Sequence, residues 1–172
     1  LAVLARSPQT GFIGDSLTSS YLAITLKRAG FDAIVITGKR DDWSTLVIED
    51  GAVRLRPAEQ LLGQSPDDVS DHLRGELGNG FRVASIGRAG ENLIRFAAIS
   101  NDGRLAGRTG LGAVMGSKKL KAIAVRGSGR LPRVAEPEQL AIEARKLSRR
   151  SLGPETAKYR ELGTAANLAF FN

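Results

Sequence analysis

Cysteine is absent from the chain, and histidine occurs only once, at His72. The lack of cysteine excludes disulfides, zinc thiolate sites and iron–sulfur ligation by these 172 residues. His72 has no second histidine or cysteine with which to hold a metal, so we interpret it as a solvated residue of a polar helix. Any metal–sulfur centre would therefore take its ligands from elsewhere.

Aromatic residues and long apolar runs are also scarce. Aromatics make up 5% of the sequence and do not alternate with basic residues, which argues against the base-stacking surfaces of single-strand nucleic-acid binders. No apolar run approaches the roughly 20 residues needed to cross a bilayer, and the first residues lack the apolar core of a signal peptide. We expect a cytoplasmic protein with no membrane span.

Positive charge, by contrast, is plentiful. The 25 Lys and Arg exceed the 18 Asp and Glu, and the net charge of +7 favours a phosphorylated cofactor, an acidic protein or nucleic acid as partner. Hydrophobic residues at 42% and charged residues at 25% are ordinary for a folded protein. Because the sequence starts without Met and stops in a helix-like segment, we expect part of a longer polypeptide.

The spacing of apolar and turn residues predicts an α+β fold with mixed sheets, hairpins and packed helices, followed by an all-helical segment. Asp50-Gly51 predicts a tight hairpin, Ser65-Pro66 a helix start and Gly30 a helix end. We expect strands over 1–5, 31–38, 45–48, 53–55, 82–86, 93–99 and 121–125, and helices over 18–29, 66–77 and 113–120. A further helix opens at Glu136-Pro137-Glu138, and the domain boundary lies near residue 130.

Glycines and cations concentrate between residues 103 and 123. The P-loop pattern fails because Ser117 separates Gly116 from Lys118, and the dinucleotide pattern fails because one residue too many precedes Gly116. Arg104 and Arg108 nevertheless flank Leu105-Ala106-Gly107, where a backbone without side-chain bulk lies between two forked donors suited to phosphate. A glycine-rich turn with solvated arginines is the alternative.

Two other segments also have more than one interpretation. Small and hydroxyl residues over 11–20 lead into the predicted helix, and we favour a cap by Ser16 or Thr18 over a phosphate contact. Glu91-Asn92 is interpreted as a turn held by the Asn side chain, with ligand positioning as the alternative. No nucleophile can be paired with a base, so we assign no catalytic residue.

The run GRAGENLIRFAAISNDGRLAGRTGLGAVMGSKKLKAIAVRG, residues 87–127, closely resembles the N-terminal domain of the aldehyde ferredoxin oxidoreductase family of tungsten-pterin enzymes. The resemblance extends to SPQTGFIGDS, to YLAITLKRAGFDAIVITGK and to RELGTAANL further along. It implies that residues 1–130 are most of a pterin-binding α+β domain and that 131–172 begin a helical second domain. The implied cofactor is tungstopterin, a bis-molybdopterin with tungsten or molybdenum, whose phosphates are bridged by Mg²⁺.

The resemblance also implies roles for individual residues. Arg104 would pair with a pterin phosphate, Ala106, Gly107 and Arg108 would complete its cradle, and the main-chain carbonyl of Leu105 would face the magnesium. The carbonyl of Leu17 would be a second magnesium ligand, next to Thr18, Ser19 and Ser20 in the cofactor-binding loop. The loop after Asn101-Asp102-Gly103 is one residue shorter than the family pattern.

One departure from the family concerns the loop before Tyr21. The family usually has Asn, a small residue and two glycines there, where this chain has Leu17, Thr18, Ser19 and Ser20. The two serine Cβ atoms narrow the approach of a pterin to the backbone. Either the cofactor sits differently or the chain is a divergent relative.

The predicted function is the cofactor-binding part of an enzyme that oxidises aldehydes to carboxylic acids and passes the electrons to ferredoxin. The parent would carry a [4Fe–4S] cluster with ligands outside this chain, and the family allows a homo-oligomer. The alternatives are a related tungsten-pterin reductase subunit acting on another substrate, such as an aromatic thioester, and a non-catalytic pterin-binding module. Nucleic-acid binding rests on the charge alone and is not expected.

Overall fold

The computed structural model describes residues 1–129 and 133–168. The chain divides into two compact units, residues 1–131 and 132–172. The first unit is built on sheets with packed helices, and the second is helical. The assignment of these units to a pterin-binding domain and to the start of a second domain stays a prediction.

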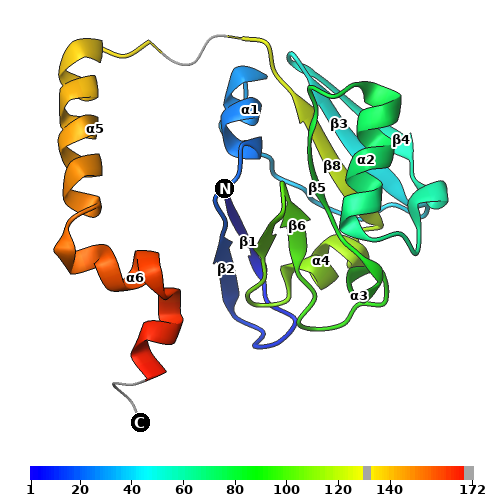
Figure 1. The fold of residues 1–172 in the computed structure, drawn as a ribbon. Coiled ribbons are helices and arrows are strands. Elements are labelled where there is room, and N and C mark those ends of the chain that lie inside the picture. The colour runs from blue at the N-terminus through cyan, green and yellow to red at the C-terminus, as the bar shows by residue number, and fades with distance from the viewer. Residues whose placement is uncertain (130–132, 169–172) are drawn as a thin grey trace. The chain divides into compact units, whose positions relative to one another are not determined.

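A mixed six-stranded sheet forms the centre of the first unit. Its strand order is β4-β3-β8-β5-β6-β7, in which β3 and β8 are parallel and the other pairs antiparallel (Figure 1). The strands are β3 (Ser44–Glu49), β4 (Ala52–Pro57), β5 (Arg82–Ser85), β6 (Ile99–Asn101), β7 (Arg104–Ala106) and β8 (Leu120–Arg126). This mixture of pairings confirms the predicted α+β class.

Two tight turns of the same kind join strands of this sheet. Asp50 and Gly51, at φ 45° and 89°, connect β3 to β4, as the sequence predicts. Asp102 and Gly103, at φ 47° and 70°, connect β6 to β7 in the same way. Positive φ at both central residues matches the twist of a two-residue hairpin, which is why both turns carry Asp-Gly.

Residues on the two faces of the sheet belong to two different cores. One face packs Val47, Val83, Ala122 and Ala124 under α2 (Pro66–Leu77) and the 3₁₀ turn η1 (Glu59–Leu61). The other packs its alternate residues under α1 (Leu22–Arg28) and α4 (Leu111–Ser117). The period of two along each strand produces this division. Ser65 Oγ caps α2 by accepting from Asp68 N–H at 3.2 Å, as predicted.

A separate two-stranded sheet precedes the large one. β1 (Ala2–Arg6) pairs antiparallel with β2 (Ile13–Leu17). Val3 and Ala5 pack against the core beneath α1 and α4, whereas Leu4, Ile13 and Leu17 on the opposite face are exposed. The predicted strand over 1–5 is confirmed, with bounds shifted by one residue.

Two predicted strands are wrong, and one predicted helix starts later than expected. Residues 31–38 form no strand, and Val35 is 85% exposed, because a β-branched run needs a neighbouring strand to pair with. Only the end of the segment 93–99 is a strand, since residues 92–97 turn back after α3 (Arg88–Glu91). The predicted helix over 18–29 starts only at Leu22 because residues 13–17 are extended in β2; Gly30 ends it at φ 96°, as predicted.

The second unit contains the predicted helix α5 (Pro137–Ser151), which has a proline at its start and Glu138 in its first turn. It continues through η2 (Pro154–Thr156), α6 (Ala157–Glu161) and η3 (Gly163–Asn167). No residue of α5 is buried. In the part of the chain that the structure describes, no helix is long and apolar enough to cross a membrane.

Candidate functional site

The hairpin that leads into one predicted cofactor-binding segment, residues 17–20, contacts the end of the other, residues 104–108. The backbone N–H of Arg108 donates to Ser16 Oγ at 3.2 Å, and Ser7 Oγ donates to the carbonyl of Thr109 at 2.8 Å. Both serines are buried, and a Cβ on Gly14 would lie 2.6 Å from the side chain of Thr109 and 3.1 Å from Cβ of Ser7. The hairpin of β1 and β2 therefore holds the backbone that follows β7.

This arrangement corrects the capping prediction for Ser16 and Thr18. The residue that precedes α1 is Tyr21, which makes no side-chain cap, and Leu22 N–H donates to Ser20 Oγ at 3.3 Å. Ser16 holds Arg108 instead, and Thr18 pairs with Leu1 through two backbone bonds of 2.9 Å. The contact of Ser16 joins residues 92 positions apart, so local sequence gave no signal for it.

Arg104 and Arg108 are both exposed, one in β7 and the other just beyond it. Within the described residues, neither guanidinium group makes a hydrogen bond or an ion pair. Arg54, Arg74 and Arg82, by contrast, each pair with a carboxylate. Two free forked donors on one short segment are suited to bind the oxygens of a phosphate.

The predicted magnesium ligands, Leu17 and Leu105, have carbonyls that point away from the neighbouring strand. Leu1 and Thr18 exchange two backbone hydrogen bonds. Hydrogen-bonded pairs alternate with non-bonded pairs in an antiparallel ladder, so the next pair, Ala2 and Leu17, exchanges none, and the carbonyl of Leu17 points away from β1. Asn101 and Arg104 flank the two-residue turn and form a hydrogen-bonded pair. The next pair, Ser100 and Leu105, is therefore a non-bonded one, and the carbonyl of Leu105 points away from β6. In the described chain, no group of three or more His, Cys, Asp or Glu could hold a metal, so a cation here would depend on such carbonyls.

The other residues of the predicted cradle differ in their exposure. Ala106 is fully buried in the core, so only its backbone can face a ligand. Gly107 is exposed, and an added Cβ there would meet only Leu105 and Ala98 at 3.9 and 4.0 Å. Since its φ is not positive either, the fold does not require glycine at this position. The absence of a side chain keeps the surface open between the two arginines.

Ser19 is exposed, and Ser20 is partly buried with its hydroxyl at the start of α1. A hollow of about 440 Å³ adjoins this segment and the turn before Arg104; it is lined by Tyr21, Asp67, Ser70, Asp71, Arg74, Arg82, Ser100, Asp102 and Gly103. The guanidinium of Arg82 lies 5.2 Å from the centre of the Tyr21 ring. The hollow is therefore lined by the residues next to the two predicted segments, Tyr21 and Gly103, and not by the segments themselves.

The turn between β6 and β7 contains two buried acceptor atoms. Asp102 Oδ1 faces Arg74 at 3.4 Å and Arg82 at 3.7 Å, but Asp102 Oδ2 has no hydrogen-bond partner among the described residues. Asn101 Oδ1 likewise has none in that part of the chain. Buried acceptors are normally satisfied, so donors from a ligand or from water fit this turn.

The later glycines of the segment 103–123 have a packing role. A Cβ on Gly110 would lie 1.8 Å from the carbonyl oxygen of Arg95, and one on Gly112 would lie 2.4 Å from that of Ala98. Gly116 would come within 2.0 Å of the Gly90 oxygen. These close approaches fix α4 directly after Arg108 and Thr109. The predicted helix and strand after Gly110 are thus confirmed as α4 and β8.

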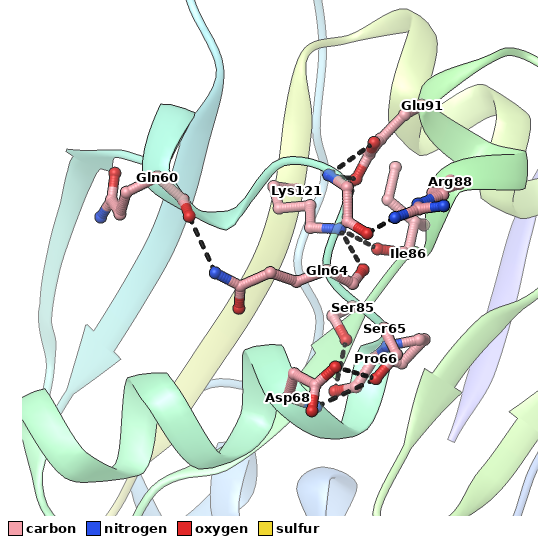
Figure 2. A network of polar contacts seen from close by, with 11 residues as sticks. Gln60, Gln64, Ser65, Pro66, Asp68, Ser85, Ile86, Arg88, Glu91 and Lys121 are labelled. Carbon is pink, nitrogen blue, oxygen red and sulfur yellow. Dashed lines mark hydrogen bonds and ion pairs between the residues drawn. The ribbon is translucent and has the colours of Figure 1, made fainter.

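Glu91 is not part of a turn held by Asn92. It ends α3, and its carboxylate lies 2.5 Å from Nζ of the buried Lys121. Sequence reasoning missed this pair; the available signal was a lysine within the apolar run of β8. Figure 2 shows the polar network around it.

Comparisons with known proteins relate this chain to one family. Residues 1–127 match the family described as "Aldehyde ferredoxin oxidoreductase, N-terminal domain". The tungsten-containing aldehyde ferredoxin oxidoreductase of Thermococcus kodakarensis is 48% identical over 145 residues, which cover 83% of this chain and 24% of that protein. The aliphatic sulfonate oxidoreductase, WOR-like subunit, of Pyrococcus furiosus is 34% identical over 96% of this chain and 28% of its own length.

A solved structure is also similar. The active site complex BamBC of benzoyl coenzyme A reductase, with 1,5-dienoyl-CoA, matches with a TM-score of 0.81 and 35% identity over 86% of this chain and 23% of that one. The chain thus spans about a quarter of the length of these relatives. The match over residues 1–127 shows that the chain belongs to the aldehyde ferredoxin oxidoreductase family of oxidoreductases, through its N-terminal domain.

Proposed function

We propose that the first unit binds a tungstopterin cofactor through the segments around Leu17 and Arg108. The observation that carries this proposal is that the exposed guanidinium groups of Arg104 and Arg108 have no partner among the described residues, on a segment that the first hairpin holds through Ser16. The open backbone at Gly107 and the outward carbonyls of Leu17 and Leu105 support it. The residues present therefore fit a phosphate-bearing group with a bridging cation.

Each of these residues has its own role in binding the cofactor. Arg104 and Arg108 donate charge-assisted hydrogen bonds to phosphate oxygens. The carbonyls of Leu17 and Leu105 offer oxygen ligands, which magnesium prefers. The Cβ atoms of Ser19 and Ser20 limit how closely the pterin can approach the backbone of this loop. When bound, the cofactor supplies the redox chemistry, with tungsten or molybdenum as its metal, and the protein supplies binding and orientation.

The proposed reaction of the whole protein is the oxidation of an aldehyde to a carboxylic acid, with ferredoxin as electron acceptor. Two relatives are named after aldehyde and ferredoxin, and both are described as tungsten-containing. A [4Fe–4S] cluster would need ligands from outside these residues, which contain no cysteine. A cytoplasmic location and a homo-oligomeric state remain predictions.

A second candidate is a tungsten-pterin oxidoreductase subunit acting on another substrate. The 35% identity to the BamBC complex and the 34% identity to the sulfonate oxidoreductase subunit favour it. A non-catalytic pterin-binding module is the third candidate, because Ser19 and Ser20 stand where the family usually has glycine. Assays of the complete gene product with aldehydes, sulfonates and aromatic thioesters distinguish the three.

The test of cofactor binding is the variant Arg104→Ala/Arg108→Ala in the complete gene product, produced in tungstate-supplemented cells. Hydrogen bonds to charged groups contribute about 1.5–3 kcal/mol each, so we expect at least about a tenfold loss of bound tungsten or molybdenum and of pterin. Arg54→Ala/Arg56→Ala is the matched control, because these arginines lie in β4 and pair with Glu49 and Glu76. Unchanged metal and pterin content in the first variant would refute the proposal.

A further inference from the structure

Lys121 is a fully buried cation in the middle of the large sheet. It lies in β8, and its side chain is 0% exposed. Nζ donates to Glu91 Oε1 at 2.5 Å, to the Ile86 carbonyl at 2.6 Å and to the Gln64 carbonyl at 3.2 Å (Figure 2). An ammonium group has three donors, and all three are used.

Glu91 joins this cation to α3 and to the loop before α2. Its carboxylate accepts the backbone N–H of Gly63 at 3.0 Å, and Arg88, also in α3, donates from Nε to the Gly63 carbonyl at 2.8 Å. Both polar groups of the Gly63 backbone are therefore held by α3. The short helix α3 is thus fixed to β8 on one side and to this loop on the other.

The backbone of α3 in turn supports the start of α4. A Cβ on Gly90, the residue before Glu91, would lie 3.0 Å from the carbonyl oxygen of Gly112 in the first turn of α4, and a Cβ on Gly116, near the end of α4, would lie 2.0 Å from the Gly90 oxygen. The turn after α3 continues the contact, because the Ala97 carbonyl accepts the N–H of Gly112 at 2.9 Å. Arg108 and Thr109 come directly before α4. The position of α3 therefore bears on the proposed phosphate-binding segment.

We infer that Lys121 and Glu91 are a positioning pair that sets the place of Arg108 through α3 and α4. The importance of the Arg108 position for cofactor binding rests on the proposed function. The structural link from the pair to Arg108 does not depend on that function. A pair that served stability alone would be replaceable by apolar residues, since replacing both members of a buried ion pair often preserves stability. Positioning instead requires the hydrogen bonds to Gly63, Gln64 and Ile86.

Two variants separate these roles in the complete gene product. Lys121→Met/Glu91→Met removes the charges and the hydrogen bonds together, whereas Glu91→Gln removes one charge and keeps an acceptor for Gly63 and Lys121. The probes are backbone hydrogen exchange of Arg108, Gly112 and Ala113, whose N–H groups all have partners, and pterin content. Exchange is compared with that of the buried amides of β8, and stability is followed as the thermal midpoint.

We expect the double variant to keep a midpoint close to that of the wild type while these three amides exchange at least tenfold faster and pterin content falls at least threefold. Glu91→Gln lowers the midpoint and leaves relative exchange within threefold of the wild type. The control Arg56→Met/Glu76→Met, at an exposed pair, changes neither probe.

Two results would overturn the inference. One is unchanged relative exchange of the three amides in a stable double variant, and the other is exchange rates that change only in proportion to the thermal midpoint in all variants. If the double variant does not fold, Glu91→Ala, which removes the acceptor for Gly63 and Lys121, decides instead: a rise of at least tenfold in the relative exchange of the three amides supports the positioning role, and unchanged relative exchange in the folded variant refutes it. Exchange requires no cofactor, so a wild type without pterin would refute the proposed function and leave this result intact.

Discussion

At the residue scale, Thr109 has the most unusual backbone in the candidate site. It is β-branched, yet its φ is 60°, a left-handed conformation that such residues rarely adopt. The hydroxyl of Ser7 donates to the carbonyl of Thr109, and the side chain of Thr109 lies against Gly14. Backbone conformations of this kind cost about 1–3 kcal/mol and persist only where the surroundings impose them. The hairpin of β1 and β2 is what imposes this one.

Gly14→Ala tests that contact. The new Cβ would lie 2.6 Å from Cβ and Oγ1 of Thr109, so we expect a loss of about 1–3 kcal/mol in the free energy of unfolding, measured with urea. Adding Thr109→Gly removes the clash and should recover most of the loss, which gives a non-additive double-mutant cycle. Gly75→Ala in α2 is the control, because its Cβ meets nothing within 4 Å and should stabilise by about 0.5–1 kcal/mol. Additive losses would contradict the contact.

At the scale of elements, local chemistry decided what could be predicted from sequence. The hairpin at Asp50-Gly51 and the helix after Ser65 were predicted because turn and cap residues act within a few positions. Residues 31–38 were wrongly predicted as a strand because pairing depends on a distant partner. The candidate segment 104–108 was found from its arginines and glycine. The Ser16–Arg108 contact and the Lys121–Glu91 pair were not, since they join residues 92 and 30 positions apart.

Gly116→Ala tests the packing of α4 on α3. Its Cβ would lie 2.0 Å from the Gly90 oxygen, and backbone cannot yield as a flexible side chain can. We expect the free energy of unfolding to fall by about 1–3 kcal/mol. Helix propensity alone would raise it, as expected for the control Gly75→Ala. The measurement is the urea midpoint at constant slope. A gain in stability at Gly116 would show that α3 and α4 are not in close contact.

At the scale of the whole molecule, family membership and fold agree. The match over residues 1–127 coincides with the unit that contains both sheets and the candidate site. The family was recognisable from sequence because the run 87–127 is long and rich in glycine, whose positions reflect close packing and tight turns. Substrate identity was not, because relatives named for aldehyde, sulfonate and benzoyl coenzyme A chemistry all share this part.

The central claim is that this unit binds a metal-pterin cofactor, and the most direct measurement is elemental and pterin analysis of the complete wild-type gene product from tungstate-supplemented cells. Metal content is read by mass spectrometry and pterin content by fluorescence after oxidation. The account predicts tungsten or molybdenum near one equivalent per chain, accompanied by pterin. A folded protein with neither metal nor pterin would contradict it.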